Sequence, residues 1–390
     1  MLGLALEGGG AKGSFHMGVV KALLEEGYTF DIVAGTSIGA LNAALIAQGD
    51  FELGYSLWEN MTTSSLFDIE DIKLENILNN KIDLDTLTYA TSKITEFIAN
   101  KGLDTSKIKL LLDQYINEDK LRASPVDLGI ITVSLSDLKP LELYKENIPY
   151  GKVASYLMAS ANFPLFKQEP LEGKYFLDGG IYDNCPINLL VKKGCTKVIA
   201  IRTFGIGFSQ KTISSDIPIV SILPSEDLGT TLIFDNALIQ RNLKMGYYDA
   251  KRALYGLKGK KYYITPTDSS FFLQALLLLT QAAILQISNS LSLSAYNTMN
   301  PTRLLFEKIL PKLSRLLKLG DSASYEDLII ALLEPLAERR AVQRFEIYTF
   351  NQFMSLLIKD GLYNEHPVPK KSHLLKIGLE FIEVLAQLTA

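Results

Sequence analysis

The chain has 390 residues, of which 47% are hydrophobic and 21% charged, and its formal net charge is -4. This length suits two domains better than one, and the apolar fraction allows a large core. The weak negative charge argues against a nucleic-acid partner, because proteins of that class usually present a basic field. Two cysteines, Cys185 and Cys195, are too few for a disulfide framework and are expected to be reduced thiols.

Short β-rich runs alternate with longer helical ones over residues 1–267, which predicts an α/β domain with a mainly parallel sheet. The expected strands are Leu2–Leu6, Asp31–Ala34, Asp127–Ser134, Lys174–Leu177, Lys197–Ile201, Ile217–Ile222 and Lys261–Ile264. Residues 53–122 are polar with helical spacing, so we expect a helical insertion beside the sheet. A glycine loop interrupts the first apolar run, so we expect a cytoplasmic protein without a signal peptide.

Strand signals disappear beyond Asp268, and residues 268–390 are expected to form an all-helical domain. Its first segment, Phe271–Ile287, carries no charge and is close to the shortest length that spans a membrane. Gln274, Gln281 and Gln286 argue against a clear transmembrane span. The segment is therefore expected to be a buried or interface-seeking helix.

A second helical segment, Leu304–Leu319, is both basic and amphipathic. Its cations are Lys308, Lys312, Arg315 and Lys318, and its apolar side carries Ile309, Leu313, Leu316 and Leu317. Such a helix suits peripheral contact with an anionic lipid surface, or ordinary packing against another domain. The sequence leaves both alternatives open.

The N-terminal glycine loop follows the first expected strand and contains the pattern G-x-G-x-x-G, formed by Gly8, Gly10 and Gly13. In a dinucleotide-binding fold this loop would hold a phosphate, and Asp31 stands near the position of the acid that binds the ribose. The pattern alone is weak. It is not a phosphate-binding Walker A loop, because no Lys-Ser/Thr pair follows the last glycine.

A second glycine motif, Gly35-Thr36-Ser37-Ile38-Gly39, lies between an expected strand and a helix rich in alanine. This is the strand–turn–helix context in which G-x-S-x-G forms a nucleophile elbow. The glycines Gly35 and Gly39 leave room for the sharp turn, and the helix N-terminus favours developing negative charge. The alternative is that Ser37 is an ordinary helix N-cap.

A serine nucleophile needs a base, and histidine is scarce in this chain. His16 opens the first helix and is expected to be a packing or surface residue. His366 and His373 belong to the helical region, beside a segment that resembles a solvated linker. Asp178 ends an apolar strand before Gly179-Gly180 and is the better candidate, with Asp183 as a rival that is more typical of a loop or cap.

Three motifs in a fixed order resemble the patatin-like phospholipase family of lipid acyl hydrolases. They are GGGAKG (Gly8–Gly13), GTSIG (Gly35–Gly39) and DGG (Asp178–Gly180), with supporting similarity in Ala159–Phe166, Asn184–Ile187 and Met245–Leu254. The resemblance covers about the first 265 residues. It implies a three-layer α/β/α domain at residues 1–267, followed by the helical domain at 268–390.

The resemblance also implies a mechanism. Ser37 would be the nucleophile and Asp178 the general base, with no metal or organic cofactor. Gly9, Gly10 and Ala11 would donate backbone N–H groups to an oxyanion. Gly8, Lys12 and Gly13 would anchor that loop. The family usually has arginine where this chain has Lys12, and lysine cannot make the forked contacts of a guanidinium.

The activity implied is phospholipase A or lysophospholipase action on membrane lipids, through an acyl-enzyme. An acyltransferase that passes the same acyl group to an alcohol is one alternative. A lipid-binding or regulatory module without turnover is another, and the intact Ser37 and Asp178 pair argues against it. A dinucleotide-binding domain would leave GTSIG and DGG unexplained.

Overall fold

The computed structural model of the protein describes residues 1–67, 102–358 and 373–389. The chain divides into two compact units, Met1–Ala250 and Lys251–Ala390.

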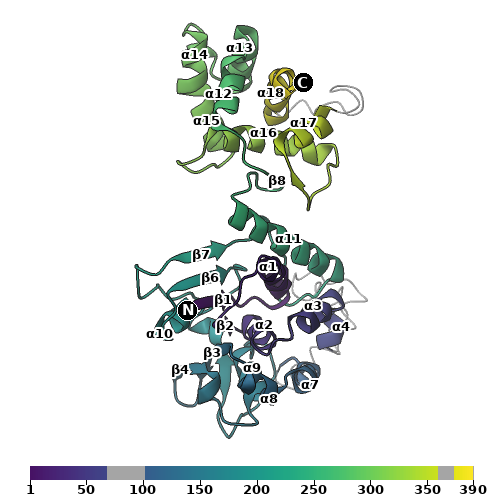
Figure 1. The fold of residues 1–390 in the computed structure, drawn as a ribbon, viewed down its shortest axis with the longest axis vertical. Coiled ribbons are helices and arrows are strands. Elements are labelled where there is room, and N and C mark those ends of the chain that lie inside the picture. The colour runs from purple at the N-terminus through teal and green to yellow at the C-terminus, as the bar shows by residue number, and fades with distance from the viewer. Residues whose placement is uncertain (68–101, 359–372, 390) are drawn as a thin grey trace. The chain divides into compact units, whose positions relative to one another are not determined.

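The first unit is built on a seven-stranded sheet. Its strands are β1 (Leu2–Leu6), β2 (Ile32–Thr36), β3 (Asp127–Ser134), β4 (Lys139–Tyr144), β5 (Phe176–Asp178), β6 (Lys197–Ile201) and β7 (Ile219–Ile222). The order is β4-β3-β2-β1-β6-β7, with β5 also paired to β3 (Figure 1). Four pairings are parallel, and only β4 and β5 run antiparallel, both to β3. The predicted mainly parallel sheet is thus confirmed.

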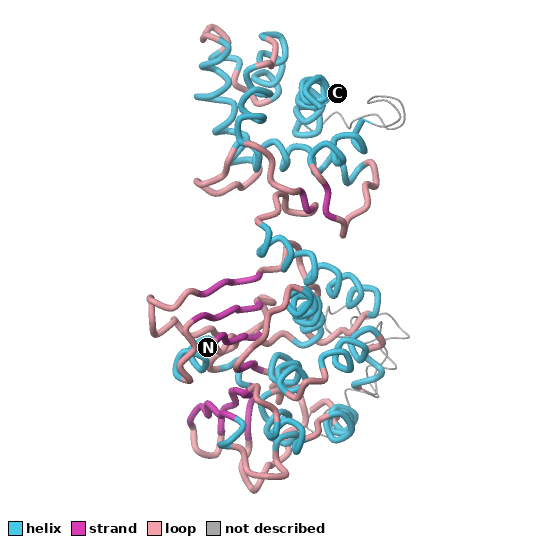
Figure 2. The backbone as a smooth tube through the Cα atoms, viewed as in Figure 1, coloured by secondary structure: helices cyan, strands magenta, loops and turns pink. Residues whose placement is uncertain are grey.

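Helices lie against both faces of this sheet (Figure 2). Those of the first unit are α1 (Ser14–Glu25), α2 (Ile38–Ala47), α3 (Phe51–Glu59), α4 (Thr63–Leu66), α7 (Ser106–Tyr115), α8 (Glu118–Ala123), α9 (Val153–Ser160), α10 (Ile187–Lys192) and α11 (Asn236–Tyr255), the last of which continues into the second unit. Every residue of β2 is buried, which is typical of a parallel strand covered on both sides. Cys185 and Cys195 are buried free thiols beside α10.

The predicted insertion at 53–122 is helical where it is described, since α3, α4, α7 and α8 fall within or overlap it. Residues 68–101 of that prediction lie outside the described residues. Strand β4 was not predicted. It is a half-exposed strand that begins Lys139-Pro140, and a proline lowers the strand signal of a short segment.

The second unit is mostly helical, as predicted. Its helices are α12 (Ser269–Leu277), α13 (Gln281–Ser290), α14 (Pro301–Leu304), α15 (Leu310–Leu316), α16 (Tyr325–Arg339), α17 (Phe350–Ile358) and α18 (His373–Thr389), with a π-helical segment at Leu305–Ile309. Together they bury one apolar core. Strand β8 (Tyr263–Ile264) was expected in the main sheet, but it pairs with β9 (Ile347–Tyr348) in this unit.

A buried carboxylate holds the segment before β8 in the helical unit. Glu334 of α16 accepts hydrogen bonds from the N–H groups of Lys260, Lys261 and Tyr262 at 2.7, 2.7 and 3.0 Å. Since the side chain is only 7% exposed, these bonds satisfy a group that would otherwise be costly to bury. The helical unit therefore begins before the boundary expected at residue 268.

The uncharged stretch Phe271–Ile287 is not one helix. It breaks between α12 and α13, and the two parts are bent by 92°. Within the described part of the chain, no single helix is both long and apolar enough to cross a membrane, although this bent pair together meets the length and composition needed. Farther along, Lys312 Nζ donates to Leu291 O at 2.5 Å and Lys308 lies over the Tyr296 ring, so two cations of the basic segment have partners in their own unit.

Candidate active site

Ser37 occupies the sharp turn between β2 and α2. Its backbone has φ 57° and ψ −128°, a conformation that is rare for a residue with a side chain. A Cβ on Gly35 would lie 2.1 Å from Gly39 O, and one on Gly39 would lie 2.3 Å from Leu6 O. Both of these positions must therefore be glycine. Ser37 stands at the N-cap position of α2, but its side chain makes no capping hydrogen bond, so the ordinary N-cap interpretation does not describe it.

Strand β3 aligns Ser37 with Asp178. Ile131 of β3 is paired with Thr36, and the next residue, Thr132, is paired with Asp178. Strand β5 thus occupies the edge of β3 that β2 leaves when it turns into α2. Ser37 and Asp178 line the same cavity as a result, and the Ser37 side chain lies close enough to Asp178 to favour its ionised form.

The Asp178 carboxylate is buried, with 5% of the residue exposed. Gly180 N–H donates to its Oδ1 at 2.8 Å. Burial raises the pKa of Asp178 to about 6, because desolvation disfavours the charged form, and the hydrogen bonds from Ser37 and Gly180 only partly oppose this. Asp178 can therefore be ionised at neutral pH and still bind a proton more tightly than an ordinary carboxylate.

The glycine loop presents two backbone donors beside Ser37. Gly10 has φ 57°, and a Cβ there would lie 2.0 Å from Thr231 O. Within the described part of the chain, the N–H groups of Gly9 and Gly10 have no hydrogen-bond partner, and both residues line the same cavity as Ser37. Ala11 differs, because its N–H donates to Thr231 O at 2.8 Å. Contrary to the expectation from the sequence, Ala11 is not available as an oxyanion donor.

The residues expected to anchor the loop make specific contacts. Lys12 Nζ donates to Phe204 O at 3.2 Å, and Gly8 N–H donates to Asn184 O at 2.9 Å. A Cβ on Gly13 would lie 2.7 Å from Cγ1 of Ile38, the residue that follows Ser37. The loop is thus packed directly against the turn that carries the serine.

An apolar cavity of about 500 Å³ opens beside Ser37 and Asp178. Its walls include Leu41 and Leu45 of α2, Leu57 and Trp58 of α3, Leu111 and Leu112 of α7, and Phe163, Phe166, Ile206 and Phe234 from loops. A pocket lined predominantly by hydrophobic side chains is typical of a site for an apolar ligand.

Residues 4–191 match the family model described as "Patatin-like phospholipase". They form a patatin-like phospholipase domain. Human "Patatin-like phospholipase domain-containing protein 6" is 28% identical over 200 residues, which are 51% of this chain and 13% of that protein. "Lysophospholipase NTE1" of Kluyveromyces lactis is 28% identical over 201 residues, 51% of this chain and 12% of that protein.

The chain spans a small part of the length of these curated relatives. Among solved structures, VipD from Legionella pneumophila is 17% identical, with 97% of this chain and 91% of that chain covered and a TM-score of 0.39. At that score the likeness adds nothing to the fold described above.

Sequence reasoning missed Glu7 of the patatin-like domain. This carboxylate is buried directly after β1 and accepts hydrogen bonds from the N–H groups of Thr203 and Phe204 at 2.6 and 2.9 Å. It also pairs with Arg202 at 2.9 Å. Its position, an acid between a buried strand and three glycines, is the signal that could have suggested a structural role.

The other candidate bases are His16, His366 and His373. His16 is fully buried, and its Nδ1 lies 3.2 Å from Asn42 Nδ2. Burial lowers the pKa of His16 to about 3, so the ring is neutral. This agrees with the packing role expected for it. His366 is outside the described residues, and His373 begins α18 of the second unit.

Asp183 has the loop role that its sequence context indicated. Its Oδ1 accepts hydrogen bonds from the N–H groups of Cys185 and Gln210 at 3.3 and 3.2 Å. Burial raises the pKa of Asp183 to about 6 as well, but the residue does not line the cavity that Ser37 and Asp178 share. Asp183 is therefore a useful control for Asp178.

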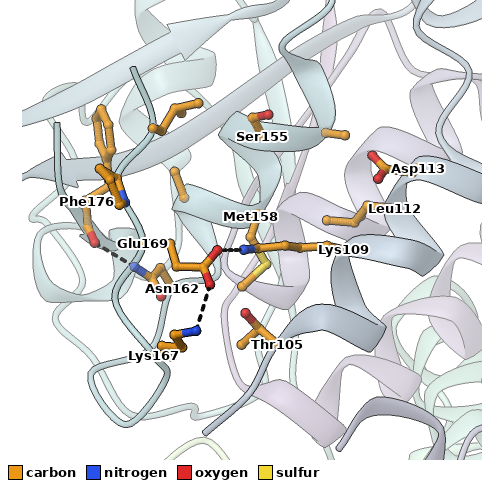
Figure 3. Close-up of a pocket in the computed structure, with 14 residues that line it drawn as sticks. Thr105, Lys109, Leu112, Asp113, Ser155, Met158, Asn162, Lys167, Glu169 and Phe176 are labelled. Carbon is orange, nitrogen blue, oxygen red and sulfur yellow. Dashed lines mark hydrogen bonds and ion pairs between the residues drawn. The ribbon is translucent and has the colours of Figure 1, made fainter. Parts of the chain in front are cut away.

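A second, smaller cavity of about 240 Å³ lies on the other side of α7 in the patatin-like domain (Figure 3). Glu169 forms ion pairs there with Lys109 and with Lys167, the second at 3.4 Å. Asn162 connects this cavity to β5, because its carbonyl accepts the N–H of Asp178 at 2.9 Å. Leu112 lines both cavities, so α7 is the wall between them.

Proposed function

We propose that the chain is a serine lipid acyl hydrolase of the phospholipase A or lysophospholipase type, with Ser37 as nucleophile and Asp178 as general base. The observation that carries the proposal is that strand pairing brings Ser37 and Asp178 together in the wall of a large apolar cavity. The family match supports a lipid ester as the substrate.

In the first half-reaction the acyl chain occupies the apolar cavity and the ester carbonyl lies at Ser37. The Ser37 oxygen attacks the carbonyl carbon while its proton passes to Asp178. The negative charge that develops on the carbonyl oxygen is stabilised by the N–H groups of Gly9 and Gly10. Donors of this kind contribute on the order of 3 kcal/mol each. The N-terminus of α2 favours the same charge.

Collapse of the tetrahedral intermediate breaks the ester bond. Asp178 returns the proton to the leaving alcohol or lysolipid, and the acyl group stays on Ser37. A water molecule then attacks the acyl-enzyme and gives its proton to Asp178. The fatty acid leaves, and the proton returns to Ser37.

The test is hydrolysis of a mixed phospholipid extract, with the products identified by mass spectrometry. Ser37→Ala and Asp178→Asn are each expected to abolish release of fatty acid while the circular dichroism of the folded protein is kept. Asp183→Asn is the matched control, because an amide oxygen can still accept the N–H groups of Cys185 and Gln210. It is expected to retain activity.

Release of fatty acid by folded Ser37→Ala would overturn this mechanism. The same experiment separates hydrolase from acyltransferase, because added alcohol would be recovered as a new ester if the acyl group were transferred to it. Products that carry the fatty acid only as free acid support the hydrolase.

A further inference from the structure

An exposed apolar segment lies next to the cavity. It follows β6 and reads Phe204-Gly205-Ile206-Gly207-Phe208. Phe204, Ile206 and Phe208 are 58%, 72% and 71% exposed, respectively. We call these three residues the apolar triplet. Single exposed apolar residues are common on protein surfaces, but three large ones on alternate positions of one short loop indicate a contact surface.

The two glycines between them face the site. A Cβ on Gly205 would lie 2.1 Å from Gly8 O, and one on Gly207 would lie 2.7 Å from Gly180 O. The loop therefore packs its glycines against the backbone of both the glycine loop and the DGG turn. Both positions therefore require glycine, while the side chains of the triplet remain exposed to solvent.

Hydrogen bonds hold the loop in this arrangement. Phe204 has φ 49°, which is strained for a bulky residue, and its N–H and C=O are bound by Glu7 and Lys12. Phe208 N–H donates to Gly180 O at 2.8 Å, and Phe208 O accepts from Asn184 N–H. These hydrogen bonds fix the backbone in a conformation that exposes the side chains of the triplet.

We propose that the apolar triplet inserts into the surface of a phospholipid bilayer and places the cavity mouth against the lipid. The inference rests on the proposed function, since a lipid ester must reach Ser37 from such a surface. Ile206 connects the exposed surface with the cavity, because it is both exposed and part of the cavity wall. The polar residues Ser209, Gln210 and Lys211 follow directly and mark the level of the head groups.

Flotation with phosphatidylcholine vesicles tests the insertion. The protein carries Ser37→Ala, so the vesicles are not degraded and the readout does not depend on catalysis. Phe204→Asn with Phe208→Ser removes two members of the triplet, and asparagine tolerates a positive φ. Ile206 is kept because it lines the cavity. The bound fraction is expected to correspond to a partition coefficient at least about tenfold lower than that of the parent.

The matched control is Leu138→Asn with Tyr150→Ser. Leu138 is 87% exposed and has φ 50°, and Tyr150 is 72% exposed, so the pair reproduces both the exposure and the backbone conformation of the tested pair. Its binding to vesicles is expected to stay unchanged. Equal binding by the tested variant and the parent, or an equal loss in the control, would overturn the proposal.

The same two double variants, with Ser37 intact, separate docking from catalysis. Phe204→Asn with Phe208→Ser is expected to hydrolyse a short, water-soluble ester at the parent's rate and vesicle phospholipid about tenfold more slowly. A parallel fall on both substrates would mean that the loop only supports the glycine loop. Failure of the proposed function has a different signature, namely ester hydrolysis that survives Ser37→Ala while flotation is unaffected.

Fluorescence gives a direct measure of insertion. The chain has one tryptophan, Trp58, which is 2% exposed. Phe208→Trp in the Ser37→Ala protein adds an exposed reporter at the triplet. Vesicles are expected to shift its emission to shorter wavelength, and brominated phospholipid is expected to quench it beyond the change seen in the parent. No such difference would contradict insertion.

Discussion

Ser37 and Asp178 are brought together in one cavity wall because a single strand, β3, pairs with the residue before Ser37 and with Asp178 itself. Backbone ladders fix the separation of the two groups, so neither depends on a flexible loop for its position. A site built on regular elements keeps its geometry better than one built on loops. The predictions below follow from this arrangement and its surroundings.

The activity should depend on the ionisation of Asp178. Its pKa is raised to about 6, and only the ionised form can take the proton from Ser37. We expect kcat/KM for a water-soluble ester to fall about tenfold per pH unit below about pH 6 and to level off above it, since this ratio reports the free enzyme. Asp183→Asn should leave the midpoint unchanged. If the midpoint of the pH profile moved in Asp183→Asn, the titration would belong to Asp183 and not to Asp178.

The same burial should make Asp178 destabilising at high pH. Its folded-state pKa lies above the ordinary value of 3.8, so folding favours the protonated form, and stability is lost as the pH rises from about 4 through about 6. Asparagine has no such dependence. The unfolding free energy of Asp178→Asn relative to the wild type should therefore rise by about 3 kcal/mol between about pH 3 and about pH 8.

Urea denaturation of both proteins at several pH values measures this difference. Ser37→Ala should keep the wild-type dependence on pH, because it retains the buried carboxyl. A difference between Asp178→Asn and the wild type that is constant over the whole range would contradict the raised pKa.

The sequence was enough to predict most of the sheet and the positions of Ser37 and Asp178 at strand ends, because short glycine motifs at strand ends have few structural interpretations. It could not show which N–H groups of the glycine loop already have a partner. Ala11 is excluded as a donor because its N–H already donates to the carbonyl of Thr231, a residue far along the chain. Helix α7 could not be foreseen as a cavity wall for the same reason. Such contacts depend on tertiary packing and cannot be predicted from local sequence patterns.

Gly10 should be intolerant of a side chain. A Cβ there would lie 2.0 Å from Thr231 O at φ 57°, so Gly10→Ala must displace the loop from the position in which it faces the carbonyl oxygen. We expect kcat to fall on the order of a hundredfold or more. Gly49→Ala is the control, because Gly49 also has positive φ, 82°, but a Cβ there meets nothing within 4 Å. It should lower the melting temperature without lowering kcat.

Lys12 should act through the position of the glycine loop and not through the head group of the lipid. Lys12→Met removes the hydrogen bond to Phe204 O, and we expect kcat to fall about three- to tenfold with little change in KM. Lys12→Arg should retain most activity, since a guanidinium can donate to the same carbonyl. A rise in KM confined to anionic phospholipids, with kcat unchanged, would show instead that Lys12 binds the head group.

The cavity should set the preferred acyl length, and Leu41 is the position at which to change it. This residue lies one turn of α2 after Ser37 and lines the cavity. Leu41→Trp fills space that the distal part of an acyl chain would use, so long chains lose contacts while short ones are less affected. We expect the ratio of kcat/KM for a long-chain ester to that for a short-chain ester to fall about tenfold.

Leu110→Trp is the matched control for this change. Leu110 is on α7 and 66% exposed, and it is not part of the cavity wall, so the same tryptophan should leave the ratio unchanged. Competition between two chain lengths in one reaction, with the released acids measured by mass spectrometry, gives the ratio directly. An equal loss on both lengths in Leu41→Trp would mean that the substitution disturbs Ser37 itself and would place the acyl chain elsewhere.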